Sequence, residues 1–243
     1  MTHPATSPTI NIEIDIASEN SFVIYFGDRH STSISAQVSS QIAATAQHIK
    51  SSLGGCLVDL VSSYASLLVI YNSLQHDHLW VRHQLQQVLN TAIEQQQDPS
   101  KLIQLPVFYS PQYGPELPLL ARNAGLSLDQ IIDLHCATQY RVYAIGFAPG
   151  FAYLGEVDPR LATARLATPR LKVPAGAVAI ADRQTAVYPA QSPGGWNLIG
   201  LCPTPMFNAE QQTHMPVAVG DRVQFYAIDQ QQYLDLGGEL HEF

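Results

Sequence analysis

The sequence is poor in charged residues and in cysteine. Charged residues make up 13% of the 243 residues, whereas hydrophobic residues make up 46%. The chain is therefore too apolar for a disordered protein and too lightly charged for a coiled coil. Its three cysteines, Cys56, Cys136 and Cys202, lie far apart and form no CxxC pair. This spacing argues against structural zinc, and the odd count argues against a disulfide framework.

Several patterns of known catalytic sites are missing. No lysine follows a glycine, so the chain has no GxxxxGK[ST] phosphate-binding loop, and GxGxxG, GxSxG and SxxK are absent as well. The histidines form no HExxH, and we expect no metal site. His76, His78 and His83 are expected to be exposed. His135 is expected at a helix end, where the dipole favours a cation, and a structural role is the preferred interpretation. The sequence therefore does not indicate a self-contained hydrolase, kinase or metalloenzyme.

Targeting signals are missing too, and the charge is unevenly distributed. Residues 1–8 lack the basic and apolar regions of a signal peptide, and no apolar run approaches the roughly 18 residues of a membrane span. We therefore expect a cytoplasmic protein. The net charge of −8 argues against binding to nucleic acid or anionic membranes. Residues 141–183, however, carry six basic and three acidic side chains, +3 in total, which leaves −11 elsewhere. This window predicts an anionic ligand or an acidic partner, unless it is a solvated loop with scattered arginines.

The first part of the chain predicts a small α+β domain over residues 1–98. Alternating residues in Thr9–Ile16 predict a strand that pairs with Ser21–Phe26 in a hairpin. A helix capped by Thr32 or Ser33 and ended by Gly54 follows. Two further strands, Leu57–Val61 and Leu67–Tyr71, precede a second helix with apolar positions from Val81 to Ile93. This order is typical of one antiparallel sheet covered by two helices.

The second part, residues 99–243, predicts a barrel or a sandwich. A strand over Gln104–Tyr109 precedes a helix opened by Pro115 and closed by Gly125, and Ser127 with Gln130 forms a capping box for another helix. Short apolar runs separated by Pro and Gly then follow: Tyr140–Phe147, Val178–Ala181, Thr185–Tyr188, Leu198–Leu201 and Arg222–Ile228. Short strands without long helices favour an antiparallel barrel or sandwich.

Residues 141–200 contain loops rich in Gly, Pro and aromatic side chains. Glycines permit close approach of a ligand or a partner, and aromatics can line a pocket or anchor an interface. Arg141 and Arg170 can hold a carboxylate or phosphate through two hydrogen bonds. For Phe147 and Phe151, burial in the core is the preferred interpretation.

Five motifs in this region carry a family resemblance. They are GFAPGFAYLG (146–155), DPRLAT (158–163), ATPRLKVPAG (167–176), QTAVYP (184–189) and SPGGWNLIG (192–200). Together they resemble the allophanate-hydrolase-subunit-1 family. That family includes the B component of the bacterial ATP-dependent 5-oxoprolinase, the kinase inhibitor KipI and a matching domain of urea carboxylase. Ala164 stands where the family has a proline, and Asp182-Arg183 stands where it has two glycines before QT.

The resemblance implies a cyclophilin-like antiparallel β-barrel for the second domain. It also implies a role as the B component of a complex that opens 5-oxoproline to glutamate, with ATP as co-substrate and no tightly bound cofactor. The expected partners are the C component, which is allophanate hydrolase subunit 2-like, and the A component, which is LamB/YcsF-like. The chain alone is expected to be inactive. The alternatives are a KipI-like histidine-kinase inhibitor and a carboxyltransferase-type component of a biotin-dependent urea carboxylase system.

We predict two sets of site residues. The predicted substrate- or anion-binding residues are Arg170, Arg141, Lys172, Gln184, Tyr153 and Tyr188. The predicted interface or pocket-lining residues are Phe147, Pro149, Gly150, Pro193, Gly194, Gly195 and Trp196. No general base is assigned, since a partner protein can supply it.

Overall fold

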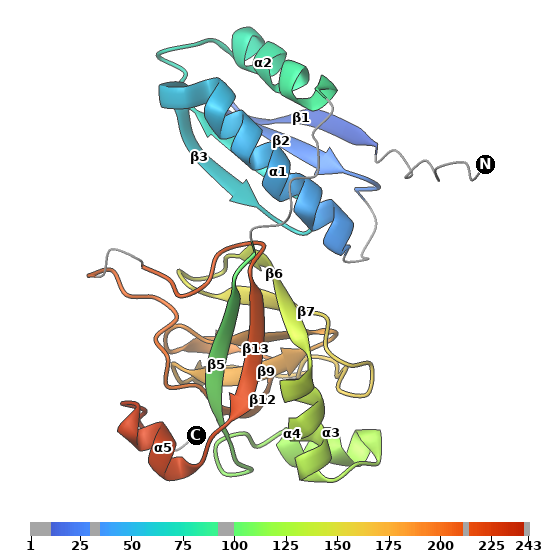
Figure 1. Ribbon diagram of the computed structural model, residues 1–243, viewed down its shortest axis with the longest axis vertical. Helices are drawn as coiled ribbons and strands as arrows, with labels where there is room; N and C mark the ends of the chain where they lie inside the picture. Colours follow the sequence, from blue (N-terminus) through green and yellow to red (C-terminus); the bar gives the residue numbers. More distant parts are fainter. Residues whose placement is uncertain (1–10, 30–34, 92–99, 211–213, 241–243) are drawn as a thin grey trace, which may run out of the picture. The chain divides into compact units, whose positions relative to one another are not determined.

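A computed structural model describes residues 11–29, 35–91, 100–210 and 214–240 (Figure 1). The chain divides into two compact units, Met1–Asp98 and Pro99–Phe243, and each is described by itself. The boundary predicted at residues 98 and 99 lies in the segment 92–99, outside the described residues.

The N-terminal unit is an antiparallel sheet with two helices. Its elements are β1 Ile12–Ser18, β2 Ser21–Phe26, α1 Ala36–Leu53, the short 3-10 helix η1 Gly54–Cys56, β3 Leu57–Ser62, β4 Ser66–Tyr71 and α2 His78–Asn90. The strand order is β1-β2-β4-β3, and every pair is antiparallel. Alternate residues of β2 and β4 join residues of both helices in one hydrophobic core. The predicted α+β arrangement is confirmed.

The ends of helix α1 follow from local chemistry. The side chain of Ser35 accepts a hydrogen bond from the backbone N–H of Val38, which satisfies one of the free donors of the first turn. The predicted caps Thr32 and Ser33 lie outside the described residues. Gly54 ends the helix with φ 49°, as predicted.

His78 is not the exposed residue that the sequence predicted. Its ring lies 4.0 Å from the ring of Phe22, and its Nδ1 lies 2.7 Å from the hydroxyl of Tyr71. Because the Tyr71 hydroxyl donates to the carbonyl of Glu19 at 3.1 Å, it accepts the hydrogen from His78 Nδ1. The prediction was wrong because Asp77 caps helix α2 and places His78 in its first turn, where it contacts the sheet.

The two other histidines near the start of α2 differ from each other. His83 is exposed, as predicted. His76 is only partly exposed, because its ring stacks on the ring of Trp80 at 3.6 Å. The prediction of exposure is therefore confirmed for His83 alone.

The C-terminal unit is a closed barrel with attached helices. The barrel order is β10-β7-β6-β13-β5-β12-β9. Its strands are β5 Leu102–Tyr109, β6 Gln139–Ile145, β7 Ala152–Gly155, β9 Ala177–Ala181, β10 Gln184–Val187, β12 Asn197–Leu201 and β13 Arg222–Ala227. A separate ribbon pairs β8 Arg170–Val173 with β11 Ser192–Gly194, and the helices are α3 Leu117–Ala124, α4 Leu128–Ala137 and α5 Gln230–Asp235.

The predicted fold class is confirmed, with one correction to the strand directions. Six neighbouring pairs of the barrel are antiparallel, but β13 runs parallel to β5 over the register Leu102–Val107 with Arg222–Ala227. Figure 1 shows these two strands side by side. The reason is geometric: a closed ring with an odd number of strands cannot alternate in direction throughout, so at least one neighbouring pair must be parallel.

The barrel has a core inside and a second core on the outer side of three strands. In β9, Val178 and Ile180 point inward, whereas the alanines at 177, 179 and 181 belong to the outer core. Successive residues of a strand point to opposite faces, so the alternation of Ala with Val and Ile specifies both cores. Small alanines leave room for large side chains above them.

His135 on α4 is fully buried inside this unit. The Thr185 hydroxyl donates to the carbonyl of Ala179 at 3.0 Å, so it accepts the hydrogen of His135 Nε2, also at 3.0 Å. The Tyr109 hydroxyl, 2.7 Å from Nδ1, then donates to that nitrogen. Burial lowers the pKa of His135 to about 3. The expected cation at a helix end is therefore wrong, because α4 packs its last turn into the barrel and the imidazole is neutral.

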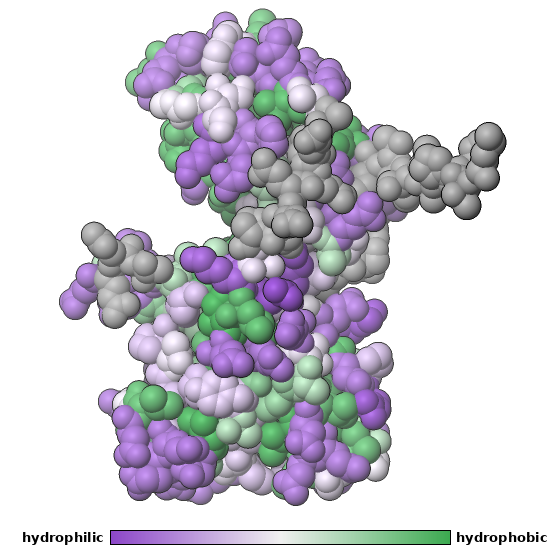
Figure 2. Space-filling view, viewed as in Figure 1, coloured by the Kyte–Doolittle hydropathy of each residue, from purple (hydrophilic) through white to green (hydrophobic). Residues whose placement is uncertain are grey.

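Hydrophilic and hydrophobic residues are both visible on the side of each unit that Figure 2 draws. On the side shown in Figure 2, the N-terminal unit presents mostly hydrophilic residues, and hydrophobic residues of the barrel unit lie in separate areas between hydrophilic ones. Among the described residues, no helix combines the length and the apolar character needed to cross a membrane.

Candidate functional site

Four aromatic side chains cluster on the outer side of the barrel, above the alanines of β9 and β10. The ring of Phe151 lies 4.9 Å from Tyr153, 5.2 Å from Tyr188 and 5.6 Å from Trp196. All three contacts are edge-to-face, a favourable geometry for aromatic pairs. Trp196 also lies below the guanidinium of Arg165, at 5.8 Å. We call Phe151, Tyr153, Tyr188 and Trp196 the aromatic cluster.

Gly194 is required by its contact with this cluster. A Cβ at Gly194 would lie 2.3 Å from the hydroxyl oxygen of Tyr188, which is too close for any other residue. That hydroxyl also hydrogen-bonds to the backbone of Trp196, and burial raises its pKa. The predicted residues Tyr153, Tyr188, Gly194 and Trp196 therefore lie together, although they come from three separate motifs.

Arg170 forms a partly buried ion pair. Its Nη2 donates to Oε1 of Glu116 at 2.5 Å, and the two side chains are 23% and 11% exposed. The second carboxylate oxygen of Glu116 accepts from the backbone N–H of Leu198 at 2.9 Å. Nη1 of Arg170 is buried without a hydrogen-bond partner among the described residues. Arg170 thus ties the β8–β11 ribbon to β12, and its contact with a substrate anion stays a prediction.

Arg141 and Gln184 lie in one row across three barrel strands. Arg141 pairs with Gly155 on β7, and Gly155 pairs with Gln184 on β10. Directly paired residues share a face, and neighbouring strands are about 4.8 Å apart, so the Cα atoms of Arg141 and Gln184 are roughly 10 Å apart. Tyr153 lies two residues before Gly155 on the same face. The register therefore brings this row next to the aromatic cluster.

Lys172 and three of the predicted interface residues, Phe147 among them, are exposed. Lys172 lies on β8, Pro193 lies on the paired strand β11, and Pro149 lies in a loop. Gly195 is partly buried, and Gly150 is buried with φ 83°. Lys172 is thus the predicted cation most open to an anion from solvent.

The core interpretation is confirmed for Phe151 and wrong for Phe147. Phe151 is 2% exposed, whereas Phe147 is 66% exposed. Phe147 has φ 71°, in the left-handed region. This conformation lets the loop close through a hydrogen bond from the N–H of Gly146 to the carbonyl of Phe151, at 3.0 Å, and leaves the Phe147 ring outside the core.

The turn between β9 and β10 carries ion pairs. Asp182 has φ 52°, a conformation that Asp adopts more readily than most residues. Asp182 lies 3.8 Å from Arg165, and Arg183 lies 2.5 Å from Glu156. The neighbouring loop, where Ala164 stands in place of the family's proline, is held by Asn197, whose side-chain amide donates to the Ala164 carbonyl at 2.9 Å.

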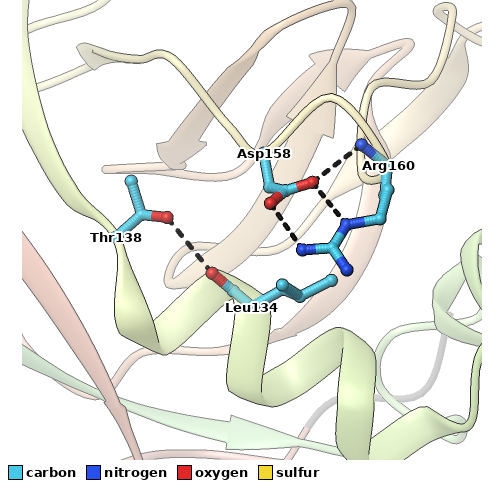
Figure 3. Close-up of polar contacts among 4 residues, drawn as sticks. All are labelled: Leu134, Thr138, Asp158 and Arg160. Atoms are coloured by element: carbon cyan, nitrogen blue, oxygen red, sulfur yellow. Dashed lines mark hydrogen bonds and ion pairs between the residues drawn. The ribbon is translucent and has the colours of Figure 1, made fainter.

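The DPRLAT motif forms a hydrogen-bonded turn beside helix α4 (Figure 3). Asp158 accepts hydrogen bonds from Nε of Arg160 at 2.9 Å and from Nη2 at 2.8 Å. These bonds lower the pKa of Asp158 to about 2, so the pair persists at neutral pH. Figure 3 also shows Thr138 donating to the carbonyl of Leu134 at the end of α4. Arg160 and α4 line a pocket of about 250 Å³.

A second groove lies next to the aromatic cluster. It has a volume of about 200 Å³, and Tyr188, Gly176, Thr204 and Tyr233 are among its lining residues. Tyr188 therefore contributes to the cluster on one side and to a groove on the other. Within the described ranges, no group of three or more His, Cys, Asp or Glu side chains is arranged to hold a metal ion.

Two residues of this region were missed by sequence reasoning. Glu116, in the segment YGPEL (113–117), is the partner of Arg170, and Arg165 stacks on Trp196. The signal for Glu116 was a carboxylate at the start of a helix in an otherwise apolar segment. Its partner lies 54 residues away, and a single sequence does not reveal such a pairing.

Comparison with known proteins identifies relatives along nearly the whole chain. The family description "carboxyltransferase domain, subdomain C and D" matches residues 12–217. A curated protein of Bacillus subtilis (strain 168), named as the B subunit of 5-oxoprolinase, is 32% identical over 235 residues, which are 93% of this chain and 96% of that protein. The family resemblance of the sequence motifs is thereby confirmed.

Solved structures of other proteins also resemble this chain over most of its length. The crystal structure of TTHA0988 has a TM-score of 0.74 and 34% identity, and the match covers 86% of this chain. The matched part is 40% of that longer chain. The urea amidolyase of Kluyveromyces lactis has a TM-score of 0.70 over 96% of this chain, with 15% identity, which shows a shared fold.

Proposed function

The chain belongs to the carboxyltransferase-domain family, subdomains C and D, and we propose that it is the B component of an ATP-dependent 5-oxoprolinase complex. The observation that carries this proposal is the match to the Bacillus subtilis protein of that name over 93% of this chain and 96% of the relative. A match of this extent includes both units and all five motifs.

The proposed reaction explains the need for ATP. The carbonyl of a lactam is a poor electrophile. In the proposed reaction ATP phosphorylates the lactam oxygen and ADP leaves, a first water adds to the activated carbon, and the ring C–N bond breaks to give the γ-acyl phosphate of glutamate. A second water then hydrolyses this acyl phosphate to glutamate and phosphate. Both the substrate carboxylate and the phosphoryl group are anionic, and cationic side chains stabilise such charges as they develop. The exposed cation Lys172 on the β8–β11 ribbon, and the row of Arg141 and Gln184 on the barrel, support an anion-binding role for the C-terminal unit.

We infer that a partner protein completes the site. The candidate region offers aromatic rings, cations and amides, and its carboxylates Asp182 and Glu156 are paired with Arg165 and Arg183. The buried carboxylate Glu116 is occupied by Arg170 and Leu198, and the buried His135 has partners on both nitrogens. Neither is free to act as a general base. The allophanate hydrolase subunit 2-like protein, the LamB/YcsF-like protein or both would supply the base, and the chain alone would be inactive.

A reconstitution assay tests this proposal. The chain is mixed with the LamB/YcsF-like and the allophanate hydrolase subunit 2-like proteins of the same genome, and glutamate release is followed with ATP and 5-oxoproline. We expect release only when all three proteins and ATP are present. Full activity without this chain, or none with all three proteins folded and mixed, would contradict the proposal.

The family description also favours a second candidate, a carboxyltransferase-type component. In that case the chain would take part in carboxyl transfer from a biotin carrier to a urea-like acceptor. The same preparation, supplied with biotin carrier, biotin carboxylase, bicarbonate and urea, separates the two functions. The KipI-like alternative predicts instead a complex with a histidine-kinase dimer and no requirement for a small molecule.

A further inference from the structure

Phe147 combines two properties that are unusual for a phenylalanine. It is 66% exposed, and its φ of 71° lies in the left-handed region, where a bulky residue is strained. Glycine would satisfy this backbone conformation without strain. Strained residues of this kind concentrate at functional sites. An aromatic ring held outside the core by a strained backbone therefore needs an explanation beyond folding.

A second exposed phenylalanine lies next to the same loop. A Cβ at Gly150 would be 2.4 Å from the carbonyl oxygen of Met206 and 2.8 Å from Cβ of Phe207, so the two loops are in direct contact. Phe207 is 38% exposed, and Pro149, in the loop of Phe147, is exposed as well. Phe147, Pro149 and Phe207 thus are exposed apolar residues on two adjoining loops, and we call these three residues the phenylalanine knob.

The knob is supported from below and lies close to positive charge. The ring of Phe147 packs edge-to-face on Phe151 at 5.4 Å, and Phe151 contacts Trp196 at 5.6 Å. The guanidinium of Arg165, 60% exposed, lies over Trp196. Arg165 also lies 3.8 Å from Asp182, and the segment 141–183, which contains both Phe147 and Arg165, carries +3 in a chain of net charge −8. An occupant of this surface would therefore combine an apolar pocket with acidic residues around it.

We propose that the phenylalanine knob is the anchor by which this chain binds the allophanate hydrolase subunit 2-like protein of the complex, and that it inserts into an apolar pocket with an acidic rim on that protein, hereafter the C component. This inference rests on the proposed function and specifies its interface. Exposed aromatic anchors supply most of the affinity of many protein interfaces. The matched part of TTHA0988 is 40% of its chain, so a related protein joins further polypeptide covalently to this fold, which agrees with a permanent neighbour.

Binding measurements with the purified C component test the knob. We expect Phe147→Asp to weaken this binding by more than about tenfold, and Phe147→Tyr to retain it. Phe147→Gly separates the effect of the ring on binding from the effect of the residue on folding. It removes the aromatic ring and also removes the backbone strain at position 147. We expect this variant to unfold at the same temperature as the wild type or higher, while its affinity falls as in Phe147→Asp. The matched control is Leu74→Asp, since Leu74 is 95% exposed in the N-terminal unit.

The outcomes are distinct. Loss of binding in the Asp and Gly variants, with normal binding by Leu74→Asp, supports the proposal. Wild-type affinity in both Phe147 variants overturns it, while glutamate release by the reconstituted wild type still leaves the proposed function standing. A change in the self-association of the chain, without any change in binding to the C component, identifies a second copy as the occupant and also overturns it. If the wild type does not bind the C component, the proposed interface and the proposed partner are both wrong.

Discussion

Burial of His135 predicts that the barrel unit loses stability in mild acid. Burial lowers the pKa of the imidazole from 6.5 to about 3 and keeps it neutral, and each of its nitrogens has a hydrogen-bond partner. In the unfolded chain the same group protonates below pH 6.5. Between these two pKa values the unfolded state binds more protons, so the free energy of unfolding falls as the pH falls from 6.5 toward 3.

The magnitude follows from the two pKa values. At pH 5, about 1.5 units below the unfolded pKa, the unfolded state gains roughly 2 kcal/mol from protonation of this one histidine, while the folded state gains almost nothing. Other groups add their own pH dependence. A variant that cannot titrate at this position isolates the contribution: in His135→Gln, the difference in stability between pH 7.5 and pH 5 should shrink by roughly 2 kcal/mol.

Denaturant unfolding gives the measurement. The chain contains two tryptophans, Trp80 and Trp196. In a Trp80→Phe background the fluorescence of Trp196 reports on the barrel unit alone. His83→Gln, on the exposed side of α2, is the matched control and should keep the full pH dependence. An NMR titration of the His135 imidazole that showed protonation near pH 6.5 in the folded protein would refute the reasoning.

Three further predictions concern the candidate site. Glu116→Gln should lower the free energy of unfolding of the barrel unit by roughly 2 kcal/mol, because it leaves the partly buried Arg170 unpaired. Arg170→Met in the same chain should restore part of that loss in urea unfolding. Losses that simply add in the double variant would contradict the pairing. Gly194→Ala should lower stability by about 1–3 kcal/mol through its overlap with Tyr188, and Tyr188→Phe should partly rescue it, whereas equal loss in both backgrounds would contradict the contact. Lys172→Gln should raise KM for 5-oxoproline about tenfold in the reconstituted complex with an unchanged melting temperature, and Lys50→Gln, the exposed control, should leave KM unchanged.

Local patterns in the sequence predicted most elements of the fold. The capping box of Ser127 and Gln130 is present as expected, and the Ala-Val-Ala-Ile-Ala alternation of 177–181 specifies a strand with two buried faces. These features depend on neighbours within a few residues, so a single sequence contains them. The parallel pairing of β5 with β13 depends on the closure of the whole ring, and no local pattern encodes it.

The candidate site was predictable in composition but only partly in geometry. Tyr153, Tyr188 and Trp196 come together as the motifs suggested. The exposure of Phe147 was not predictable, because hydrophobicity favours burial and a left-handed backbone at a non-glycine residue has no clear sequence signal. Glu116 as the partner of Arg170 depends on tertiary packing, as does the fully bonded state of His135.

The parallel pairing of β5 with β13 affects how the barrel folds. The two strands pair in continuous register although Leu102 and Arg222 are 120 positions apart. Strands so distant along the chain pair slowly, because the entropy cost of closing a long loop precedes the favourable contacts between them. Until they meet, both strands expose unpaired edges, which can pair with other chains. The pairing of β5 with β13 is therefore the folding step at which crowding or mild heat would favour aggregation.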